Sequence, residues 1–182
     1  YREEEQGGTQ IGTTKKGIGP CYEDKIARIG IRMIDLLNPE ILREKIEKNL
    51  KTKNSLFEKY FEKPTLDVEE IYQEFIALGE RLKDRIVDTE LEINEAIKDG
   101  KNILFEGAQA LMLDIDFGTY PYVTSSSPST GGVCTGAGVP PTALQNLIGV
   151  AKAYTTRVGN GPFPTELDNE LGENIRQIGA EF

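Results

Sequence analysis

Apolar residues spaced three or four positions apart predict a helix over residues 22–37. Asn38 is followed by a proline, and we expect the helix to end there because the residue before proline resists the helical conformation. Pro39 suits the first turn of a helix, where no N–H donor is needed. A second helix is therefore expected from Pro39 to about Tyr60.

Two more helices are predicted before residue 101. Asp67 has a side chain that caps helices, and an apolar stripe at helical spacing follows it as far as Ile86. The pattern slips at residues 88–90, which indicates a short break. A further helix is then expected to end at Gly100, a natural C-terminal cap. Residues 22–100 are therefore expected to form a helical layer with a structural role.

Short apolar runs replace the helical spacing in the second half of the chain. A buried strand is predicted over residues 103–107, and a second strand, rich in β-branched residues, over 149–158. Between them we expect a glycine- and serine-rich loop at 128–138 and a short helix at 140–148. A last helix is predicted over 172–182. The predicted fold class is therefore α/β, a mostly parallel sheet with a helical subdomain beside it.

Polar residues follow the first predicted strand. Residues 106–109 (Glu-Gly-Ala-Gln) have small or polar side chains where a buried strand would normally continue. Three residues with hydroxyl groups follow at 124–126. Open α/β sheets bind their ligands at the carboxyl ends of strands, so this stretch is a candidate binding site. The alternative is an ordinary loop in which Asp114 and Asp116 accept hydrogen bonds from the local backbone.

A second candidate site lies in the glycine-rich segment 6–20 (QGGTQIGTTKKGIGP). Such a segment can surround a phosphate, because glycines free the backbone N–H groups, hydroxyls donate hydrogen bonds and lysines supply charge. It lacks the GxxxxGK[ST] order of a Walker A loop. A flexible loop with solvated lysines is the alternative interpretation.

Composition narrows the class of protein. The 182 residues are enough for one domain with a sizeable core, and the net charge of −9 argues against a nucleic-acid binder that works through bulk charge. Histidine is absent, so the commonest general acid or base is missing. Cys21 and Cys134 lack CxxC spacing and are expected to be free thiols in a reducing compartment. Without a long apolar run, no membrane span is expected, and the predicted location is the cytosol.

Five motifs together resemble one enzyme family. They are IGTTKKGIGPCYEDK at 11–25, EGAQ at 106–109, LDIDFGTYPYVTSS at 113–126, GGVCTGAGVP at 131–140 and AYTTRVGNGPFPTEL at 153–167. This set resembles the adenylosuccinate synthetase family over nearly the whole chain, which corresponds to its middle part. The first residue is not Met, and we expect an internal piece of a longer protein. The resemblance implies that 1–182 is the central part of a single domain with a P-loop-NTPase-like α/β fold. Residues 22–100 would be its helical subdomain, and 101–182 would carry the sheet and the IMP-site loops.

The resemblance also implies a reaction and its partners. The family is a GTP- and Mg²⁺-dependent ligase of purine and AMP biosynthesis that joins IMP and L-aspartate, acts as a homodimer and is cytoplasmic. A phosphoryl group is first placed on the IMP base oxygen, and the aspartate amine then displaces it. The family's Gly-Asp-Glu-Gly-Lys-Gly-Lys motif, its catalytic histidine and its guanine site do not occur in this sequence. We therefore expect no catalytic, GTP-binding or metal-binding residue here, and no activity from the isolated chain.

The resemblance assigns IMP-binding roles to individual residues. Thr14 and Thr124 would bind the IMP phosphate, and Gln109 the hypoxanthine edge. Val158 would line the ribose and base site. Arg28 would reach the phosphate in trans, from the partner subunit, because a guanidinium matches phosphate oxygens in a bidentate way. The alternative for Arg28 is a local pair with a carboxylate four positions earlier.

Some positions depart from the family pattern, and a second function stays open. Lys15-Lys16 stands where many members have Gly-Arg, and Ala110 where many bacterial members have Gly, which would narrow the base site. The alternative function is a non-catalytic nucleotide-binding or dimerisation module. A source gene that continues at both ends into the missing motifs would exclude this alternative.

Overall fold

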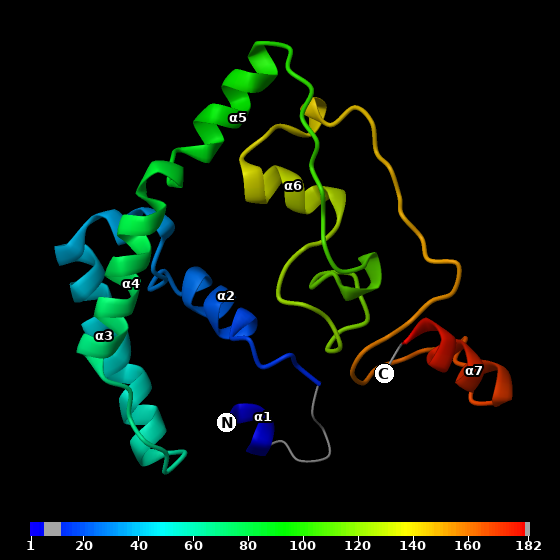
Figure 1. Cartoon of the computed structure of the whole chain (residues 1–182), viewed down its shortest axis with the longest axis horizontal. Helices are drawn as coiled ribbons and strands as arrows, with labels where there is room; N and C mark the ends of the chain where they lie inside the picture. The colour runs from blue at the N-terminus through cyan, green and yellow to red at the C-terminus, as the bar shows by residue number, and fades with distance from the viewer. Residues whose placement is uncertain (6–11, 181–182) are drawn as a thin grey trace. The chain divides into compact units, whose positions relative to one another are not determined.

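The computed structural model describes residues 1–5 and 12–180, and the chain divides into two compact units. The first unit comprises Tyr1 and Gly17–Leu104, and the second comprises Arg2–Lys16 and Phe105–Phe182. Helices are concentrated in the first unit, whereas long extended segments connect short helices in the second (Figure 1). No helix in the described ranges is long and apolar enough to cross a lipid bilayer. Cys21 and Cys134 are free thiols in the structure.

The first unit follows the predicted succession of helices after residue 38. Its elements are α2 (Ile18–Ile26), η2 (Met33–Leu37), α3 (Pro39–Lys59), α4 (Val68–Leu82), η3 (Lys83–Arg85) and α5 (Thr89–Lys98). The predictions for α3, α4 and α5 are confirmed.

Short-range caps explain where these helices begin. The side chain of Asn38 accepts a hydrogen bond from the Ile41 N–H at 3.1 Å at the start of α3. Asp67 accepts one from the Glu70 N–H at 2.8 Å at the start of α4. Asp88 does the same at the start of α5, where Leu91 N lies 3.0 Å away. Each cap satisfies a backbone donor that the first helical turn leaves without a partner.

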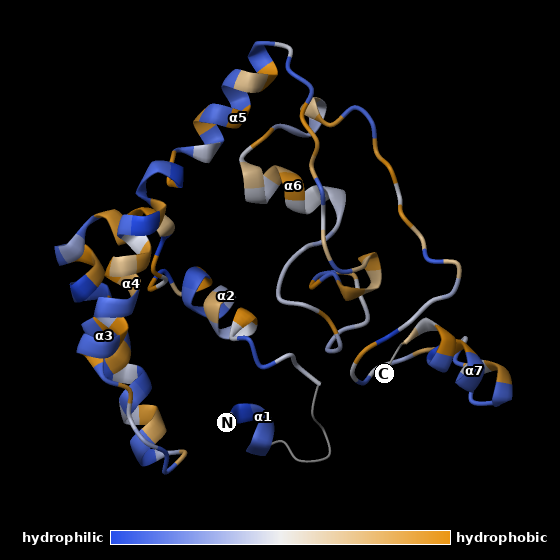
Figure 2. Ribbon diagram, in the orientation of Figure 1, coloured by the Kyte–Doolittle hydropathy of each residue, from blue (hydrophilic) through white to orange (hydrophobic). Residues whose placement is uncertain are grey.

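The core of the first unit is small and lies between η2, α3 and α4. Leu36, Leu42, Ile46 and Leu50 are buried, and apolar side chains of α4 pack against them. Polar and apolar surfaces alternate around α3 and α4, as expected for helices that bury one side (Figure 2). For the described residues, the prediction of a sizeable core from chain length is therefore wrong.

The predicted helix over residues 22–37 is also wrong. The chain leaves the helix after Ile26, because Arg28 has a φ of 62° and cannot continue a right-handed helix. The N–H groups of Ile29 and Gly30 both bond to the Asp24 carbonyl at 3.0 Å, which closes the helix end. A separate short 3₁₀ helix, η2, follows at Met33–Leu37.

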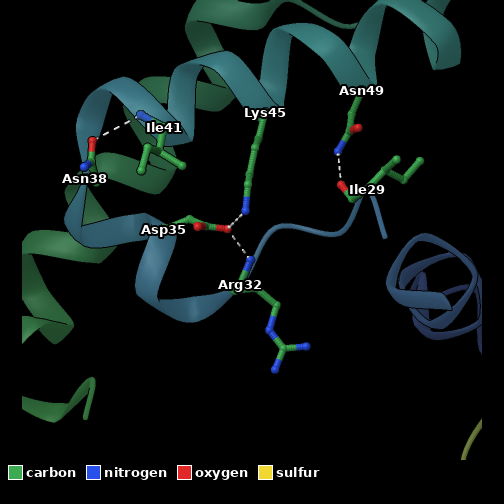
Figure 3. A network of polar contacts seen from close by, with 7 residues as sticks. All are labelled: Ile29, Arg32, Asp35, Asn38, Ile41, Lys45 and Asn49. Atoms are coloured by element: carbon green, nitrogen blue, oxygen red, sulfur yellow. Dashed lines mark hydrogen bonds and ion pairs between the residues drawn. The ribbon is translucent and has the colours of Figure 1, made fainter. Parts of the chain in front are cut away.

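Polar side chains of α3 hold the segment between α2 and η2. Lys45 and Asn49 stand four positions apart on one side of the helix. Lys45 Nζ lies 2.5 Å from the Asp35 carboxylate, and the Asn49 amide donates to the Ile29 carbonyl at 2.8 Å (Figure 3). A further step of four along the helix, Lys53 Nζ lies 2.9 Å from the Asp24 carboxylate. We call Lys45, Asn49 and Lys53 the α3 polar stripe.

The second unit contains short helices in places that the sequence pattern did not indicate. They are α1 (Arg2–Glu5), η4 (Leu111–Leu113), α6 (Thr130–Ala137), η5 (Pro141–Ala143) and α7 (Glu170–Gly179). The segment expected to be a loop at 128–138 contains α6, and the helix expected at 140–148 is only the 3₁₀ turn η5. The last helix begins earlier than predicted, where the Asn169 side chain accepts the Gly172 N–H at 3.0 Å.

Within the described residues, neither predicted strand is present. Residues 103–107 and 149–158 run as extended segments (Figure 1) but are not assigned as strands. A strand needs the backbone of a neighbour, and these segments leave apolar side chains in solvent, with Leu104 85% and Val150 96% exposed. The predicted mostly parallel sheet is therefore not formed by the part of the chain that the structure describes.

Candidate functional site

The loop that carries Thr14 binds an anionic group. The N–H groups of Gly12 and Thr13 both donate to Glu3 Oε1 at 2.9 Å, and the Thr13 hydroxyl donates to Oε2. Gly12 has a φ of 82°, a conformation that suits glycine and helps turn successive N–H groups toward one acceptor. The hydrogen bonds from Thr13 lower the pKa of Glu3. Within the glycine-rich segment predicted to surround a phosphate, Gly12 and Thr13 thus donate hydrogen bonds to a carboxylate. Residues 6–11 of this segment lie outside the described residues.

Arg28 sits in the first unit, in the left-handed turn that ends α2. Its side chain is exposed. The alternative of a local pair between Asp24 and Arg28 is not observed, because the Asp24 carboxylate pairs with Lys53 instead. Among the described residues, the Arg28 guanidinium makes no hydrogen bond or ion pair, and its fork of donors is available to a ligand.

Gln109 occupies a strained turn at the end of the extended segment 103–107. Its φ is 58°, which is rare for a residue with a side chain, and the side chain is exposed. Ile103, in the first unit, and Phe105, in the second, are half-buried, while Leu104 between them is exposed. The amide of Gln109 is therefore presented at the end of a segment anchored by its apolar residues.

A buried aspartate organises the loop that carries Thr124. The Asp114 side chain is fully buried, and its Oδ1 accepts a hydrogen bond from the Asp116 N–H at 2.9 Å. Burial acts to raise the pKa of Asp114, but the hydrogen bonds to the carboxylate, from the Asp116 N–H first, outweigh it and lower the pKa. The expectation that Asp114 fixes this loop through backbone hydrogen bonds is confirmed. Thr124 itself is half-buried, and its N–H donates to the Leu113 carbonyl at 2.9 Å.

Val158 lies on the extended segment that precedes the turn at 159–161. Its side chain is 84% exposed, so it is free to line a ligand rather than to pack in a core. The next residue, Gly159, meets the loop of Thr14: a Cβ on Gly12 would lie 3.0 Å from Gly159 Cα. The segments of Val158 and Thr14 are therefore neighbours within the second unit.

The second unit thus contains Thr14, Gln109, Thr124 and Val158, whereas Arg28 belongs to the first unit. Sequence reasoning missed two residues, Glu3 and Arg157. Arg157 stands within the AYTTRVGNGPFPTEL motif, and its guanidinium binds the turn before Thr124. No pattern in the sequence indicates that Glu3 reaches the loop at 12–14.

Comparisons with known proteins agree on one family. The family model described as adenylosuccinate synthetase matches residues 1–182. The adenylosuccinate synthetase of Oceanobacillus iheyensis is 56% identical over 181 residues, which are 100% of this chain and 42% of that protein. That of Heliobacterium modesticaldum is 57% identical over 180 residues, 99% of this chain and 42% of the relative.

A solved structure gives the same result. Fully ligated adenylosuccinate synthetase from Plasmodium falciparum is 44% identical, with a TM-score of 0.92 over 100% of this chain and 42% of that one. This chain therefore spans less than half the length of the relatives that it matches. The match of the family model over all 182 residues is decisive: the chain belongs to the adenylosuccinate synthetase family.

Proposed function

We propose that this chain is the central part of a GTP-dependent ligase that joins IMP and L-aspartate to form adenylosuccinate. The family membership and the names of its relatives support this function. In the proposed reaction, the γ-phosphoryl group of GTP passes to the IMP base oxygen. The aspartate amine then forms the new C–N bond, and phosphate leaves. The chain spans 42% of the relatives' length, so other parts of the protein would supply the rest of the site.

The observation that carries this proposal is that the loop beside Thr14 binds the carboxylate of Glu3. Two consecutive backbone N–H groups and the Thr13 hydroxyl converge on one carboxylate, that of Glu3. The same kind of donor set recognises phosphate oxygens. Thr14 follows directly, with a hydroxyl that can donate to a phosphate. This loop lies in the same compact unit as Gln109, Thr124 and Val158, which supports a shared IMP site.

Each of these side chains has chemistry that suits one part of IMP. The hydroxyls of Thr14 and Thr124 would donate to phosphate oxygens. The Gln109 amide offers both a donor and an acceptor, which the oxo-purine edge requires. Val158, with its exposed apolar side chain, would contact the ribose and base.

Arg28 would complete this site from the partner subunit of a homodimer. Its exposed guanidinium makes no polar contact among the described residues, and it projects from a left-handed turn whose neighbours are fixed to α3. A planar fork of N–H donors can bind two phosphate oxygens at once, at little cost in ordering because the turn is already held.

The magnesium ion and GTP would bind elsewhere in the protein. Mg²⁺ prefers carboxylate and other oxygen ligands. Within the described ranges, no group of three or more acidic, histidine or cysteine side chains is placed to hold a metal. The residues present here do not fit this metal, and we assign it no ligand in this chain.

The extended segments would gain their sheet in the whole protein. Residues 103–107 and 149–158 leave apolar side chains exposed, which suits strands that pair with other parts of the chain in a mostly parallel sheet. We also infer that 1–182 is the central part of a single domain, with 22–100 as helical subdomain and 101–182 as the sheet and IMP loops. The location inferred for this enzyme is the cytoplasm.

A subunit-mixing experiment tests the function and the trans role of Arg28 together. The full-length protein should form adenylosuccinate from IMP, aspartate and MgGTP, whereas Arg28→Ala and Gln109→Ala should each be nearly inactive. In a mixture allowed to exchange subunits, half of the dimers pair one variant with the other. Each such dimer has one site with both residues intact, so activity should return to about a quarter of wild type.

The outcomes separate the hypotheses. No product from the full-length wild-type protein would refute the ligase and favour the non-catalytic module. An active wild type whose mixed variants show no recovery would contradict only the assignment of Arg28 in trans. Arg81→Ala, an exposed arginine of α4, is the matched control and should retain full activity.

A further inference from the structure

Arg157 makes several hydrogen bonds within the second unit, although it lies next to the proposed site rather than in it. Its Nη2 donates to the Tyr122 carbonyl at 3.0 Å, and its Nε donates to the Asn160 carbonyl at 3.0 Å. Both terminal nitrogens also lie 3.3 Å from the Thr119 hydroxyl oxygen. One side chain therefore joins two segments that are 35 or more positions apart in sequence.

These bonds act on the turn from which Thr124 emerges. The Tyr122 N–H donates to the Thr119 carbonyl at 2.8 Å, so the residues on either side of this turn are tied to each other as well as to Arg157. Two residues later, the Thr124 N–H bonds to Leu113. The guanidinium holds one end of this short segment and the Leu113 carbonyl the other, so the backbone that carries the Thr124 side chain is held at both ends.

The same side chain determines where Val158 points. Neighbouring residues on an extended segment point in opposite directions. Arg157 is half-buried and bound to the turn, so the exposed Val158 is directed away from that turn. An anchored Arg157 thus sets the direction of the apolar residue assigned to the ribose and base.

A glycine provides the space for this arrangement. Gly161 has a φ of 123°, and a Cβ added to it would lie 2.3 Å from Arg157 Nη2 and 2.8 Å from the Tyr122 Cβ. The backbone of the turn at 159–161 therefore lies directly against the guanidinium. Any side chain at position 161 would displace Arg157 from its carbonyl acceptors.

We propose that Arg157 is a positioning residue for the IMP site, which holds Thr124 and Val158 in a fixed relation without touching the substrate. This inference rests on the proposed function, since it concerns the same site. Its Nε and Nη2 donors are bound to protein acceptors, so its effect on IMP is carried by the two residues that it places. A misplacement of about 1 Å in a binding group can cost about a hundredfold in rate.

The test uses full-length protein with Arg157→Ala and Arg157→Lys, assayed for the KM of each substrate. Arg157→Ala should raise the KM for IMP about tenfold to a hundredfold and change those for aspartate and GTP less than about twofold. Arg157→Lys keeps the charge but loses the planar fork, and an intermediate KM for IMP is expected. Arg176→Ala, at a half-exposed arginine of α7 that pairs with Glu173, is the control and should behave as wild type.

Hydrogen exchange provides a second measurement that does not depend on any substrate. The amides of Tyr122 and Thr124 should exchange faster in Arg157→Lys than in wild type, and at the wild-type rate in Arg176→Ala. An unchanged KM for IMP in an active enzyme, or an equal rise for all three substrates, would overturn the inference. So would unchanged exchange at both amides. A wild-type protein that does not bind IMP would instead refute the proposed function. The exchange data need no substrate, so they distinguish that outcome from a failure of Arg157 to hold the loop.

Discussion

Replacing Asp35 by alanine should destabilise the first unit, because this carboxylate joins η2 to α3. Asp35 is 7% exposed, and its Oδ2 accepts hydrogen bonds from Lys45 Nζ at 2.5 Å and from the Arg32 N–H at 2.7 Å. Figure 3 shows both bonds converging on that oxygen. The segment that they hold includes Arg28, so the prediction concerns the presentation of that residue as well as stability.

The size of the effect follows from these contacts. Hydrogen bonds to a charged group contribute about 1.5–3 kcal/mol each. Part of this lost stability is regained in the variant, because alanine removes the free-energy cost of burying a carboxylate. The side chain of Lys45 is 35% exposed, so its ammonium can reach water after the change and is not left buried without a partner. The expected net loss in the free energy of unfolding is about 2 kcal/mol.

The effect should depend on pH in a defined direction. Burial acts to raise the pKa of Asp35, but the hydrogen bonds from Lys45 and the Arg32 backbone outweigh it, and the pKa lies below its ordinary value of 3.8. A carboxyl group with a lowered pKa stabilises the folded state above the unfolded pKa, and this stability is lost as the pH falls through the folded pKa. The difference between wild type and Asp35→Ala should therefore be full at pH 7 and shrink as the pH falls below about 4.

Urea unfolding followed by circular dichroism at pH 7 and at pH 3 measures this difference. Asp84→Ala, at an exposed aspartate of η3, is the matched control and should change the free energy of unfolding by less than about 0.5 kcal/mol. A double-mutant cycle with Lys45→Met isolates the ion pair. A loss below 0.5 kcal/mol for Asp35→Ala, or one that is the same at both pH values, would refute this account of the network.

Three further predictions concern the core and the two loops of the second unit. Leu42 is fully buried, so Leu42→Ala should cost about 2–5 kcal/mol in urea unfolding, whereas the same change at the half-exposed Leu66 should cost under about 1 kcal/mol. Glu3→Gln should reduce the exchange protection of the Gly12 and Thr13 amides at neutral pH. In wild type that protection should fall as the pH drops through the lowered pKa of Glu3, and equal protection in both proteins would contradict the contact. Asp114→Asn should speed chymotrypsin cleavage within residues 115–124 at pH 7, and an unchanged cleavage rate would argue against Asp114 as the organiser of that loop.

Helix starts could be predicted from the sequence because their causes are local. Asn38, Asp67 and Asp88 each cap a backbone donor only three positions ahead. Where α2 ends depends instead on distant contacts. The Asn49 amide holds Ile29 across 20 positions, and Lys53 holds Asp24 across 29. A stretch of sequence short enough to show helical spacing does not include both partners of either contact. The apolar spacing at 22–37 therefore predicted one continuous helix where the chain makes a turn.

The two expected strands illustrate a different limit. Half-buried and exposed side chains do alternate over 103–105, since Ile103 and Phe105 are half-buried and Leu104 is exposed. Alternation describes an extended backbone, but a strand also requires a partner for its N–H and C=O groups. The sequence could predict the conformation of each segment, but it does not show which other backbone would pair with it.

Backbone conformation at the proposed site could not be predicted from the sequence. Arg28 and Gln109 have positive φ, at 62° and 58°, as do Lys15, Glu62 and Ala180, to which no IMP-binding role is assigned. Such a conformation costs about 1–2 kcal/mol for a residue with a Cβ, and glycine would remove most of that cost. Glycine would also remove the guanidinium and the amide assigned to IMP. Glycine would be more stable in these turns. In such a turn, the backbone itself directs the long polar side chain. The same strain at Glu62 and Ala180 shows that it is a feature of these turns, and at Arg28 and Gln109 it holds the side chain in one direction before any ligand arrives.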